Sequence, residues 1–332
     1  MSDKAARYRN RIPHLIIGPM SIAAVAKGLT TFIVPPRWLN RAEGRTLSAR
    51  YCYSVYMRHI VRLHAVGADT DPRTIAEIGP GASIGTGLAG LIAGADRYHG
   101  FDIKAYGSSP RSLAVFDELV VLFKARAPIP GTDEFARIKP ALPDLAFPGH
   151  ILTEQRLARA LSDERLAHLR AALTPEGMAV HGATVSYVAP WFEASQVTHA
   201  SVDWIFSQAV MEHVDDLAAT YAACRDWLRP GAAMSHQIDF KSHGTATAWN
   251  GHWAYSALTW RMIRGARGYL INRAPHSRHR AALAAAGFEI LEDQPVKRDD
   301  GLGRARLASP FRDLGDDDLT TAGAFIIARA PA

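Results

Sequence analysis

The sequence predicts an α/β fold in which helices cover both faces of a largely parallel sheet. Short apolar segments such as "TIAEIG" (74–79) and "VDWIFS" (202–207) have the length of buried strands, and helical segments separate them. A run of glycines, "GPGASIGTG", follows the first of these strands directly. The 332 residues are 48% hydrophobic and 21% charged, as expected for a globular protein with a sizeable core.

The expected elements alternate along the chain, with one irregular proline-rich stretch at 128–150. Strands are expected at 74–79, 97–102, 184–188, 202–207, 232–240 and 322–330. Helices are expected at 45–66, 85–95, 110–127, 153–173 and 215–228, and a helix followed by a strand is expected at 277–293. The turn "RPG" (229–231) separates the last of these single helices from the strand at 232–240.

Cysteine content and charge limit the class of protein. Cys52 and Cys224 are far apart and lack CxxC spacing, which argues against a disulfide scaffold or a structural zinc site and suits a reducing compartment such as the cytoplasm. The formal charge of +6 favours anionic partners in general: nucleotides, phosphorylated substrates, nucleic acid or a membrane surface. His236, Asp239 and His243 match no strong ligand motif, so no metal is expected.

The glycine-rich loop after the first strand has the composition of a cofactor-binding loop. Residues without a Cβ permit a sharp turn and a close approach of backbone to a nucleotide-type cofactor. A dinucleotide fingerprint would require a third glycine where Ile84 stands, which weakens the interpretation as an NAD site. Asp102 ends the second strand, where its carboxylate can accept hydrogen bonds from both hydroxyls of a ribose.

Several blocks taken together resemble the class I S-adenosylmethionine-dependent methyltransferases. They are "EIGPGASIG", "GFD", "VDWIFSQAVMEHVDD", "LRPGAAMSHQIDF", "AAGFEILE" and "GAFIIARA", which span residues 74 to 329. The resemblance implies a doubly wound, Rossmann-like sheet of seven strands whose last strand is inserted antiparallel. It also implies S-adenosylmethionine as the cofactor, lying over the carboxyl ends of the first strands. The subtype resembles bacterial methyltransferases of small molecules and of polysaccharide biosynthesis.

The resemblance assigns cofactor contacts position by position. Asp102 matches the acid that binds the ribose, and Ser83 is expected to bind the cofactor's carboxylate. Pro190 and Trp191 stand as an apolar wall for adenine, where the family more commonly has an aspartate and a small residue. The residues expected against the methionine portion are Glu77, Gly79, Gly81 and Gly85, and those expected beneath the sulfonium are Gln208 and Ala209.

The acceptor side is expected at His213 and in the segment after the strand at 232–240. Methyl transfer to a hydroxyl needs a general base, and a histidine, with an ordinary pKa of about 6.5, suits that role. The expected catalytic residues are His213, Asp239 and His243. The expected acceptor contacts are His236, His252, Trp253, Tyr255, Arg261 and Arg264. A solvated surface loop rich in histidine and a solvated basic face are the alternatives at these positions.

The domain organisation expected from the sequence is an N-terminal helical extension (1–70) followed by a methyltransferase domain (71–332). Two insertions interrupt that domain, a helical and proline-rich one at 103–180 and an acceptor-side one at 241–276. The proline-rich stretch and the N-terminal segment are expected to form a lid over the acceptor. The apolar run within residues 12–34 is too short and too broken to span a membrane, and is interpreted as a packed helix, a membrane-surface anchor or a cleaved leader.

Three functions remain open on these grounds. The first is O-methylation of a sugar or other small anionic acceptor, phosphorylated or linked to a nucleotide or lipid, with a His/Asp general base. The second is methylation of RNA, which the charge and the interleaved arginines and aromatics favour, but "SQAVMEH" stands where enzymes acting on exocyclic base amines carry Asn-Pro-Pro-Tyr or Asp-Pro-Pro-Tyr. The third is a methyltransferase-like binding protein without catalysis, which the intact glycines and Asp102 disfavour.

Overall fold

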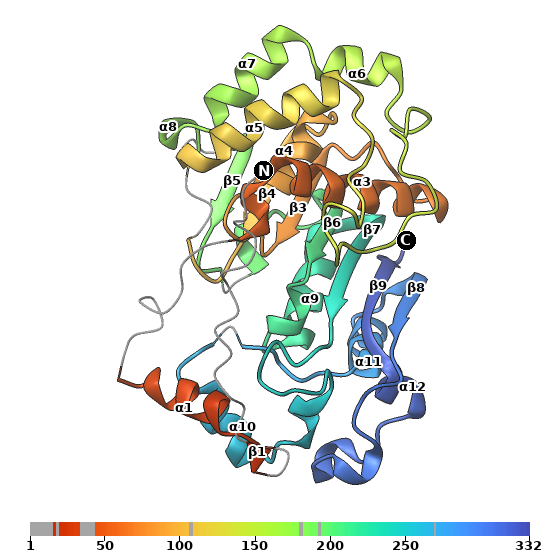
Figure 1. Ribbon diagram of the computed structural model, residues 1–332. Coiled ribbons are helices and arrows are strands. Elements are labelled where there is room, and N and C mark those ends of the chain that lie inside the picture. The colour runs from red at the N-terminus through yellow and green to blue at the C-terminus, as the bar shows by residue number, and fades with distance from the viewer. Residues whose placement is uncertain are drawn as a thin grey trace, which may run out of the picture. The chain divides into compact units, whose positions relative to one another are not determined.

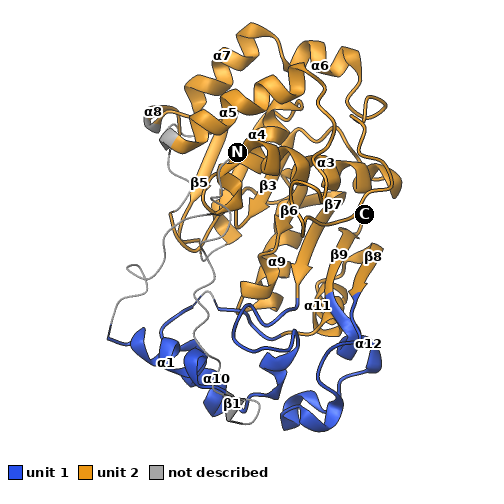
Figure 2. Ribbon diagram, viewed as in Figure 1, with its two compact units in different colours: residues 1–40, 240–273, 297–322 blue, residues 41–239, 274–296, 323–332 orange. Residues whose placement is uncertain are grey.

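The computed structural model describes residues 16–17, 20–33, 44–105, 109–178, 182–191, 194–268 and 270–332. The chain folds as two compact units, each described by itself below (Figure 2). Unit 1 comprises residues 1–40, 240–273 and 297–322, and unit 2 comprises residues 41–239, 274–296 and 323–332.

Unit 2 is built on a seven-stranded sheet with the order β5-β4-β3-β6-β7-β9-β8. Its strands are β3 (Thr74–Ile78), β4 (Arg97–Phe101), β5 (Val185–Val188), β6 (Val202–Gln208), β7 (Leu228–Asp239), β8 (Glu289–Lys297) and β9 (Thr321–Arg329). Neighbouring strands from β5 to β7 pair parallel, whereas β9 pairs antiparallel with β7. This order, with the last strand inserted antiparallel, confirms the fold expected from the sequence.

Helices cover both faces of this sheet (Figure 1). One face carries α3 (Ala49–Ala65), α4 (Gly85–Ile92) and α5 (Ser109–Lys124), whose apolar side chains join those of the strands in the main core. The other face carries α9 (Leu217–Trp227) and α11 (His276–Ala285), which a hydrogen bond between Tyr221 and His279 links at 3.1 Å. The remaining elements of unit 2 are α6 (Glu154–Ala160), α7 (Asp163–Ala172), α8 (Pro175–Met178), η1 (Arg45–Leu47), η2 (Ala194–Gln196) and η3 (Met211–His213).

The single charged helix expected at 153–173 is in fact two helices, α6 and α7. Ser162 has an extended backbone, and its side chain accepts a hydrogen bond from the backbone N–H of Arg165. A serine in this conformation begins a new helix because it satisfies one of the backbone donors that have no partner in the first turn. The turn expected at 229–231 lies within β7, where the pairing with β6 is irregular.

Buried hydrogen bonds from α3 fix the proline-rich stretch in place. The buried guanidinium of Arg58 donates to the backbone oxygens of Pro130 (3.0 Å) and Pro140 (2.7 Å). Ser54 donates to the same Pro130 oxygen at 2.7 Å, and Tyr53 donates to Ala127 O at 2.6 Å. Because unsatisfied buried carbonyls are costly, these bonds hold this part of the stretch against α3. Its expected role as a lid over the acceptor stays a prediction.

Unit 1 contains two small apolar cores. In the first, α1 (Ile22–Thr30) packs on α10 (Ala257–Arg264) so closely that a Cβ at Gly28 would collide with Met262 O. In the second, Trp249 and Trp253 pack with Leu307. The other elements of this unit are β1 (Ile16–Ile17), β2 (Met20–Ser21), η4 (Gly251–Ala254), η5 (Arg304–Arg306), η6 (Ser309–Phe311) and α12 (Asp316–Thr320).

The division into units differs from the expected boundary at residue 70. Residues 44–65 belong to unit 2, whereas residues 20–33 belong to unit 1 together with most of the insertion expected at 241–276. Part of the apolar run at 12–34 lies outside the described residues. Within the described part of the chain, no helix combines the length and the hydropathy that crossing a bilayer requires.

Candidate active site

The loop after β3 depends on two glycines in the left-handed region of backbone space. Gly79 has φ +70° and Gly81 has φ +78°, values that residues with a Cβ rarely adopt. A Cβ on Gly79 would lie 2.5 Å from the methyl carbons of Val210. The N–H of Gly79 donates to Phe101 O at 2.7 Å. The loop therefore lies tightly between the end of β4 and the segment that follows β6.

Ser83 ties the loop to η1. Its fully buried hydroxyl donates to Thr46 O and accepts from the N–H of Gly85 at 3.2 Å, while its own N–H donates to the Thr46 side chain at 3.2 Å. Ser83 thus shapes the loop, in place of the bond to the cofactor's carboxylate that we expected. A Cβ on Gly85 would lie 2.5 Å from the sulfur of Cys52, so α4 begins directly against α3.

Glu77 lies beneath the loop and not on its open side. Its carboxylate accepts from the hydroxyl of Tyr98 (2.8 Å) and from the N–H of Gly87 (3.2 Å), and only 2% of the residue is exposed. Burial raises the pKa of Glu77 to about 8. A Cβ on Gly87 would collide with the Tyr98 ring, so the absence of a side chain at this position lets α4 approach the carboxylate. Glu77 therefore joins β3, β4 and the start of α4.

Asp102 connects the loop to the end of β4. One carboxylate oxygen accepts from Gly81 N at 3.2 Å, and the other accepts from Ile103 N at 2.7 Å and Lys104 N at 3.4 Å. Burial raises the pKa of Asp102 above its ordinary value, against the lowering effect of these bonds. A carboxylate has about four acceptor positions, so capacity remains for a ribose hydroxyl. Backbone held open by glycine beside such a carboxylate fits a nucleoside cofactor.

Trp191 lies beside Asp102, the acid expected to bind the ribose. The backbone N–H of Trp191 donates to Asp102 O at 3.2 Å, and its half-buried ring lies 5.7 Å from that of Phe101 and 5.5 Å from that of Trp227. Pro190, which precedes it, is exposed. This arrangement is consistent with the expected apolar wall for an adenine ring, which remains a prediction.

His59, which the sequence did not indicate, holds the end of β6. Its Nε2 bonds the amide oxygen of Gln208 at 3.1 Å, and the amide nitrogen of Gln208 donates to Lys139 O at 3.1 Å. Burial lowers the pKa of His59 to about 4, so this histidine of α3 is neutral at physiological pH. Ala209 follows with φ +56°, a strained value for a residue with a side chain, and its N–H donates to Gln237 O at 2.7 Å.

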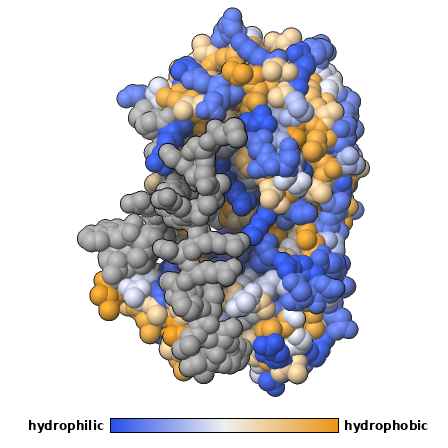
Figure 3. All heavy atoms as spheres, viewed as in Figure 1, coloured by the Kyte–Doolittle hydropathy of each residue, from blue (hydrophilic) through white to orange (hydrophobic). Residues whose placement is uncertain are grey.

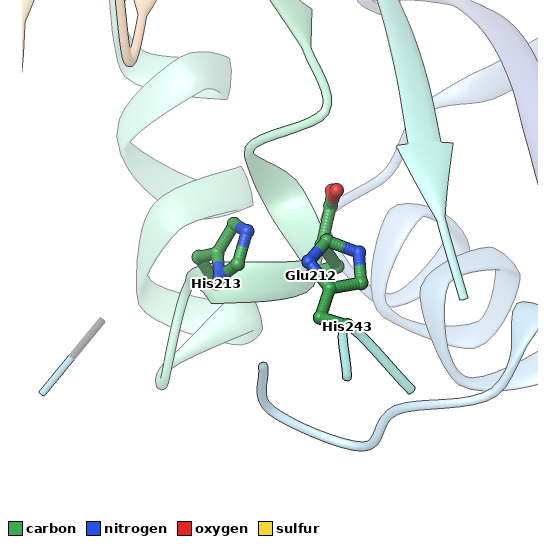
Figure 4. Close-up of side chains that lie close together, drawn as sticks. All are labelled: Glu212, His213 and His243. Atoms are coloured by element: carbon green, nitrogen blue, oxygen red, sulfur yellow. The ribbon is translucent and has the colours of Figure 1, made fainter. Parts of the chain in front are cut away.

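The expected base His213 is the last residue of the turn η3, which begins two residues after Ala209. Figure 4 shows Glu212 and His213 on consecutive positions of the turn; Glu212 is buried and His213 is half-buried. The turn contacts β7, whose last residue is Asp239. Since β3, β4, β6 and β7 run parallel, His213, Asp239 and Asp102 all follow strand ends at the same edge of the sheet.

His236 does not lie with these residues. It is 1% exposed, its Nδ1 bonds the Ser207 hydroxyl at 2.8 Å, and its ring lies 5.9 Å from that of Tyr221 on α9. Burial lowers its pKa to about 3. The side chain is part of the packing between the sheet and α9, which is not the acceptor contact expected from the sequence.

The expected acceptor residues of unit 1 differ in exposure. His252, Trp253 and Tyr255 are buried, with Trp253 Nε1 donating to Arg273 O at 2.9 Å and the Tyr255 hydroxyl donating to Thr245 O at 2.7 Å. They form part of the interior of the unit, whereas the sequence analysis expected them to contact the acceptor. His243 is exposed and has φ +46°.

The arginines of this unit do not share a helix face. The helix α10 ends at Arg264, because Gly265 has φ +56° and interrupts the helical backbone before Arg267. Arg264 donates to the backbone oxygens of Arg267 and Gly268, both at 3.2 Å. Arg261 is exposed. Arg261 and Arg264 are thus the only two of these arginines within α10.

Comparisons with known proteins place this geometry in context. Residues 154–235, from α6 into β7, match the family described as "Methyltransferase domain". No curated protein matches the chain.

Among solved structures, the chain is similar to three methyltransferases at low identity. One is the methyltransferase in a complex with the Haloferax volcanii Trm112 methyltransferase activator, with 15% identity over 83% of this chain and 91% of that chain and a TM-score of 0.38. Another is an S-adenosylmethionine-dependent methyltransferase from Mesorhizobium loti, with 14% identity over 81% of this chain and 96% of that chain and a TM-score of 0.39. A third is Haemonchus contortus phosphoethanolamine N-methyltransferase 2 in complex with S-adenosyl-L-methionine, with 13% identity over 82% of this chain and 52% of that chain and a TM-score of 0.40. These likenesses are too distant to carry an argument about the substrate.

The sheet order with its antiparallel last strand, the glycine loop and Asp102 define a Rossmann-like domain for a nucleoside-containing cofactor. The matched family lies in the same unit and covers three of the parallel strands. The matched segment and the sheet order are together those of a class I S-adenosylmethionine-dependent methyltransferase, the class of enzyme whose cofactor is S-adenosylmethionine.

The variant Asp102→Ala should weaken the binding of S-adenosylmethionine by roughly 10- to 100-fold, as expected for the loss of charge-assisted hydrogen bonds. Calorimetric titration of both proteins measures this directly. Asp117→Ala, which removes an exposed carboxylate paired with Arg170 on the same unit, is the control and should bind like the wild type. Equal affinity of the Asp102 variant and the control would exclude Asp102 from the cofactor site.

Glu77→Gln should make stability less dependent on pH. The folded-state pKa of Glu77, about 8, lies above the reference value of 4.5, so unfolding releases a proton between these values. The contribution of Glu77 to the free energy of unfolding is fully present below pH 4.5 and is lost as pH rises toward 8. The neutral glutamine removes this slope and can still accept the Tyr98 bond. Urea unfolding of both proteins between pH 4.5 and 8 measures this slope. Free energies of unfolding that change with pH in parallel in the two proteins would contradict the prediction.

Proposed function

We propose that the enzyme methylates a hydroxyl of a small anionic acceptor, such as a phosphorylated or nucleotide- or lipid-linked sugar. His213 acts as the general base and Asp239 as its partner near the acceptor. The observation that carries this proposal is the position of both residues at the same sheet edge as Asp102. His243, the third expected catalytic residue, belongs to unit 1, and its role stays a prediction.

The strand register brings the two catalytic candidates to one edge. Gln208 of β6 pairs with Gln237 of β7, and Ala209 N bonds Gln237 O at 2.7 Å. Asp239 follows Gln237 by two residues, and His213 follows Gln208 by five residues, on a turn that contacts β7. Ligands of open α/β sheets bind outside the carboxyl ends of the strands, so an acceptor there meets both side chains.

The chemistry asks the protein mainly for positioning. When bound, S-adenosylmethionine supplies an electrophilic methyl group on a sulfur that leaves readily. The protein's part is to aim an acceptor oxygen at that carbon and to remove the proton from the oxygen as the new C–O bond forms. In our proposal the imidazole of His213 takes the proton and the carboxylate of Asp239 stabilises the resulting imidazolium.

The pairing of surface cations with carboxylates supports a small acceptor over RNA. Many of the exposed arginines and lysines that the structure describes pair with a carboxylate and so do not form a free basic surface. The pairs include Arg50–Glu134, Arg126–Glu154, Arg170–Asp117, Arg229–Asp203, Lys297–Asp317, Arg298–Asp300 and Arg304–Asp316. Nucleic-acid affinity depends on cations available to neutralise phosphates, and these pairs reduce their number.

The expected outcome is S-adenosylhomocysteine formation with nucleotide sugars or sugar phosphates and none with RNA. His213→Ala should lower kcat by about 10²- to 10⁴-fold, the usual contribution of a general base, and leave cofactor binding unchanged. His199→Ala is the matched control, because His199 is an exposed histidine of the same unit bonded to Asp226. Turnover of RNA alone would overturn the choice of acceptor, and full activity of His213→Ala would overturn the base.

We also propose that unit 1 touches the surface of an anionic membrane through α1 and α10. Large apolar side chains on these helices and in the turn after α1 are exposed: Ile22, Leu29, Phe32, Ile33 and Leu258, the last three by 64%, 85% and 69%. Figure 3 shows this apolar surface over α1, at the lower left. Exposed Lys27 and Arg261 lie on the same two helices and complement anionic headgroups.

Replacing Phe32 and Ile33 by serine should lower the binding to vesicles containing phosphatidylserine by about 10-fold or more, as expected for two partly buried apolar side chains. Vesicle co-sedimentation measures it. Val121→Ser is the control, because Val121 is 65% exposed on α5 of unit 2. Absence of wild-type binding to such vesicles would end the proposal.

A further inference from the structure

Arg273 is the most unusual cation of unit 1. Its backbone has φ +68°, a strained value for a residue that is not glycine, and only 9% of the residue is exposed. Strained backbone persists where the surrounding structure holds it, and such positions cluster at binding sites. Here the backbone is held by Trp253, whose Nε1 donates to Arg273 O at 2.9 Å.

The guanidinium group of Arg273 meets aromatic rings and a carbonyl. Its central carbon lies 5.0 Å from the ring centroid of Trp260 and 4.4 Å from that of Phe311. Nη2 donates to Tyr255 O at 2.7 Å, whereas the buried Nε has no acceptor among the described residues. Rings above a guanidinium stabilise its charge but leave the in-plane N–H donors to other partners.

Among the described residues, no carboxylate forms an ion pair with Arg273. In the same unit, Asp300, Asp316 and Asp317 pair with other cations, namely Arg298, Arg304 and Lys297. Burial lowers the pKa of Arg273 to about 10, so the group still carries its charge at neutral pH. A buried charge without a counterion is costly, and an anionic ligand would remove that cost.

A second unsatisfied donor lies in the same aromatic cluster. Trp249 is 6% exposed, and its Nε1 has no acceptor in the described part of the chain. The ring of Trp249 lies 5.8 Å from that of Trp253, which in turn stacks 6.2 Å from Phe311, the ring under Arg273. Two buried N–H donors in one small cluster, with no acidic side chain paired to either, match the chemistry of an oxyanion.

We propose that Arg273 binds a carboxylate or phosphate oxyanion in unit 1. The two other arginines expected to bind an anion differ from it, since Arg264 is engaged with backbone oxygens and Arg261 is exposed. A planar guanidinium fixed by two rings can grip such a group through two donors at once.

The proposal is tested by titrating the protein with inorganic phosphate, or with acetate, at constant ionic strength and without S-adenosylmethionine. We expect a saturable rise in Tm and a change in tryptophan fluorescence, because Trp260 contacts the guanidinium. Arg273→Met should abolish both responses, Arg273→Lys should weaken them by about 10-fold through loss of the planar fork, and Arg261→Met should leave them unchanged.

A purely structural clamp predicts a different result. Arg273→Met would then lower Tm while the wild type shows no response to phosphate, or the variant would keep the wild-type response; either outcome overturns the proposal. If Arg273→Met does not fold, Arg273→Lys and Trp249→Phe take its place, and unchanged responses in both overturn it equally.

Discussion

The absence of a side chain at Gly79 is the constraint on which the cofactor site depends. The φ of +70° turns the chain out of β3, and the missing Cβ leaves room for Val210 after β6. Gly79 N also bonds Phe101 O at the end of β4. Three strand ends thus meet at one residue, which lets Asp102 reach Gly81 N and fixes the start of the segment that carries His213. A larger residue at 79 would displace all of these together.

The sequence predicted the sheet well because its strands are short apolar runs with sharp boundaries. The blocks ending at Ile78, Phe101 and Gln208 also carry the candidate site. The glycine loop and the acid at the strand end are readable from the residues themselves, whereas the edge carrying His213 was implied by the family resemblance. Such features are local: a glycine run, an acid at a strand end and a turn after a strand are readable without knowing what packs above them.

What the sequence could not predict depends on contacts between distant segments. His59 stands in an apolar helix and shows no motif, yet it bonds Gln208, which lies 149 positions away. Ser83 has the position of a ligand contact but its hydroxyl is taken by Thr46. His252 and Trp253 resemble pocket residues, whereas the packing of unit 1 buries them. The split at Ser162 depends on a helix-capping serine within a charged pattern that is typical of one continuous helix.

The bonds from α3 to the proline-rich stretch have a thermodynamic consequence for ligand binding. A loop that orders only when its ligand arrives loses backbone and side-chain entropy at that moment, which weakens the observed affinity. Here Arg58 and Ser54 order the stretch when the chain folds, and Gln208 connects it to the sheet edge through Lys139 O. Part of the binding surface of unit 2 is consequently preorganised, so its ordering subtracts nothing from the free energy of association.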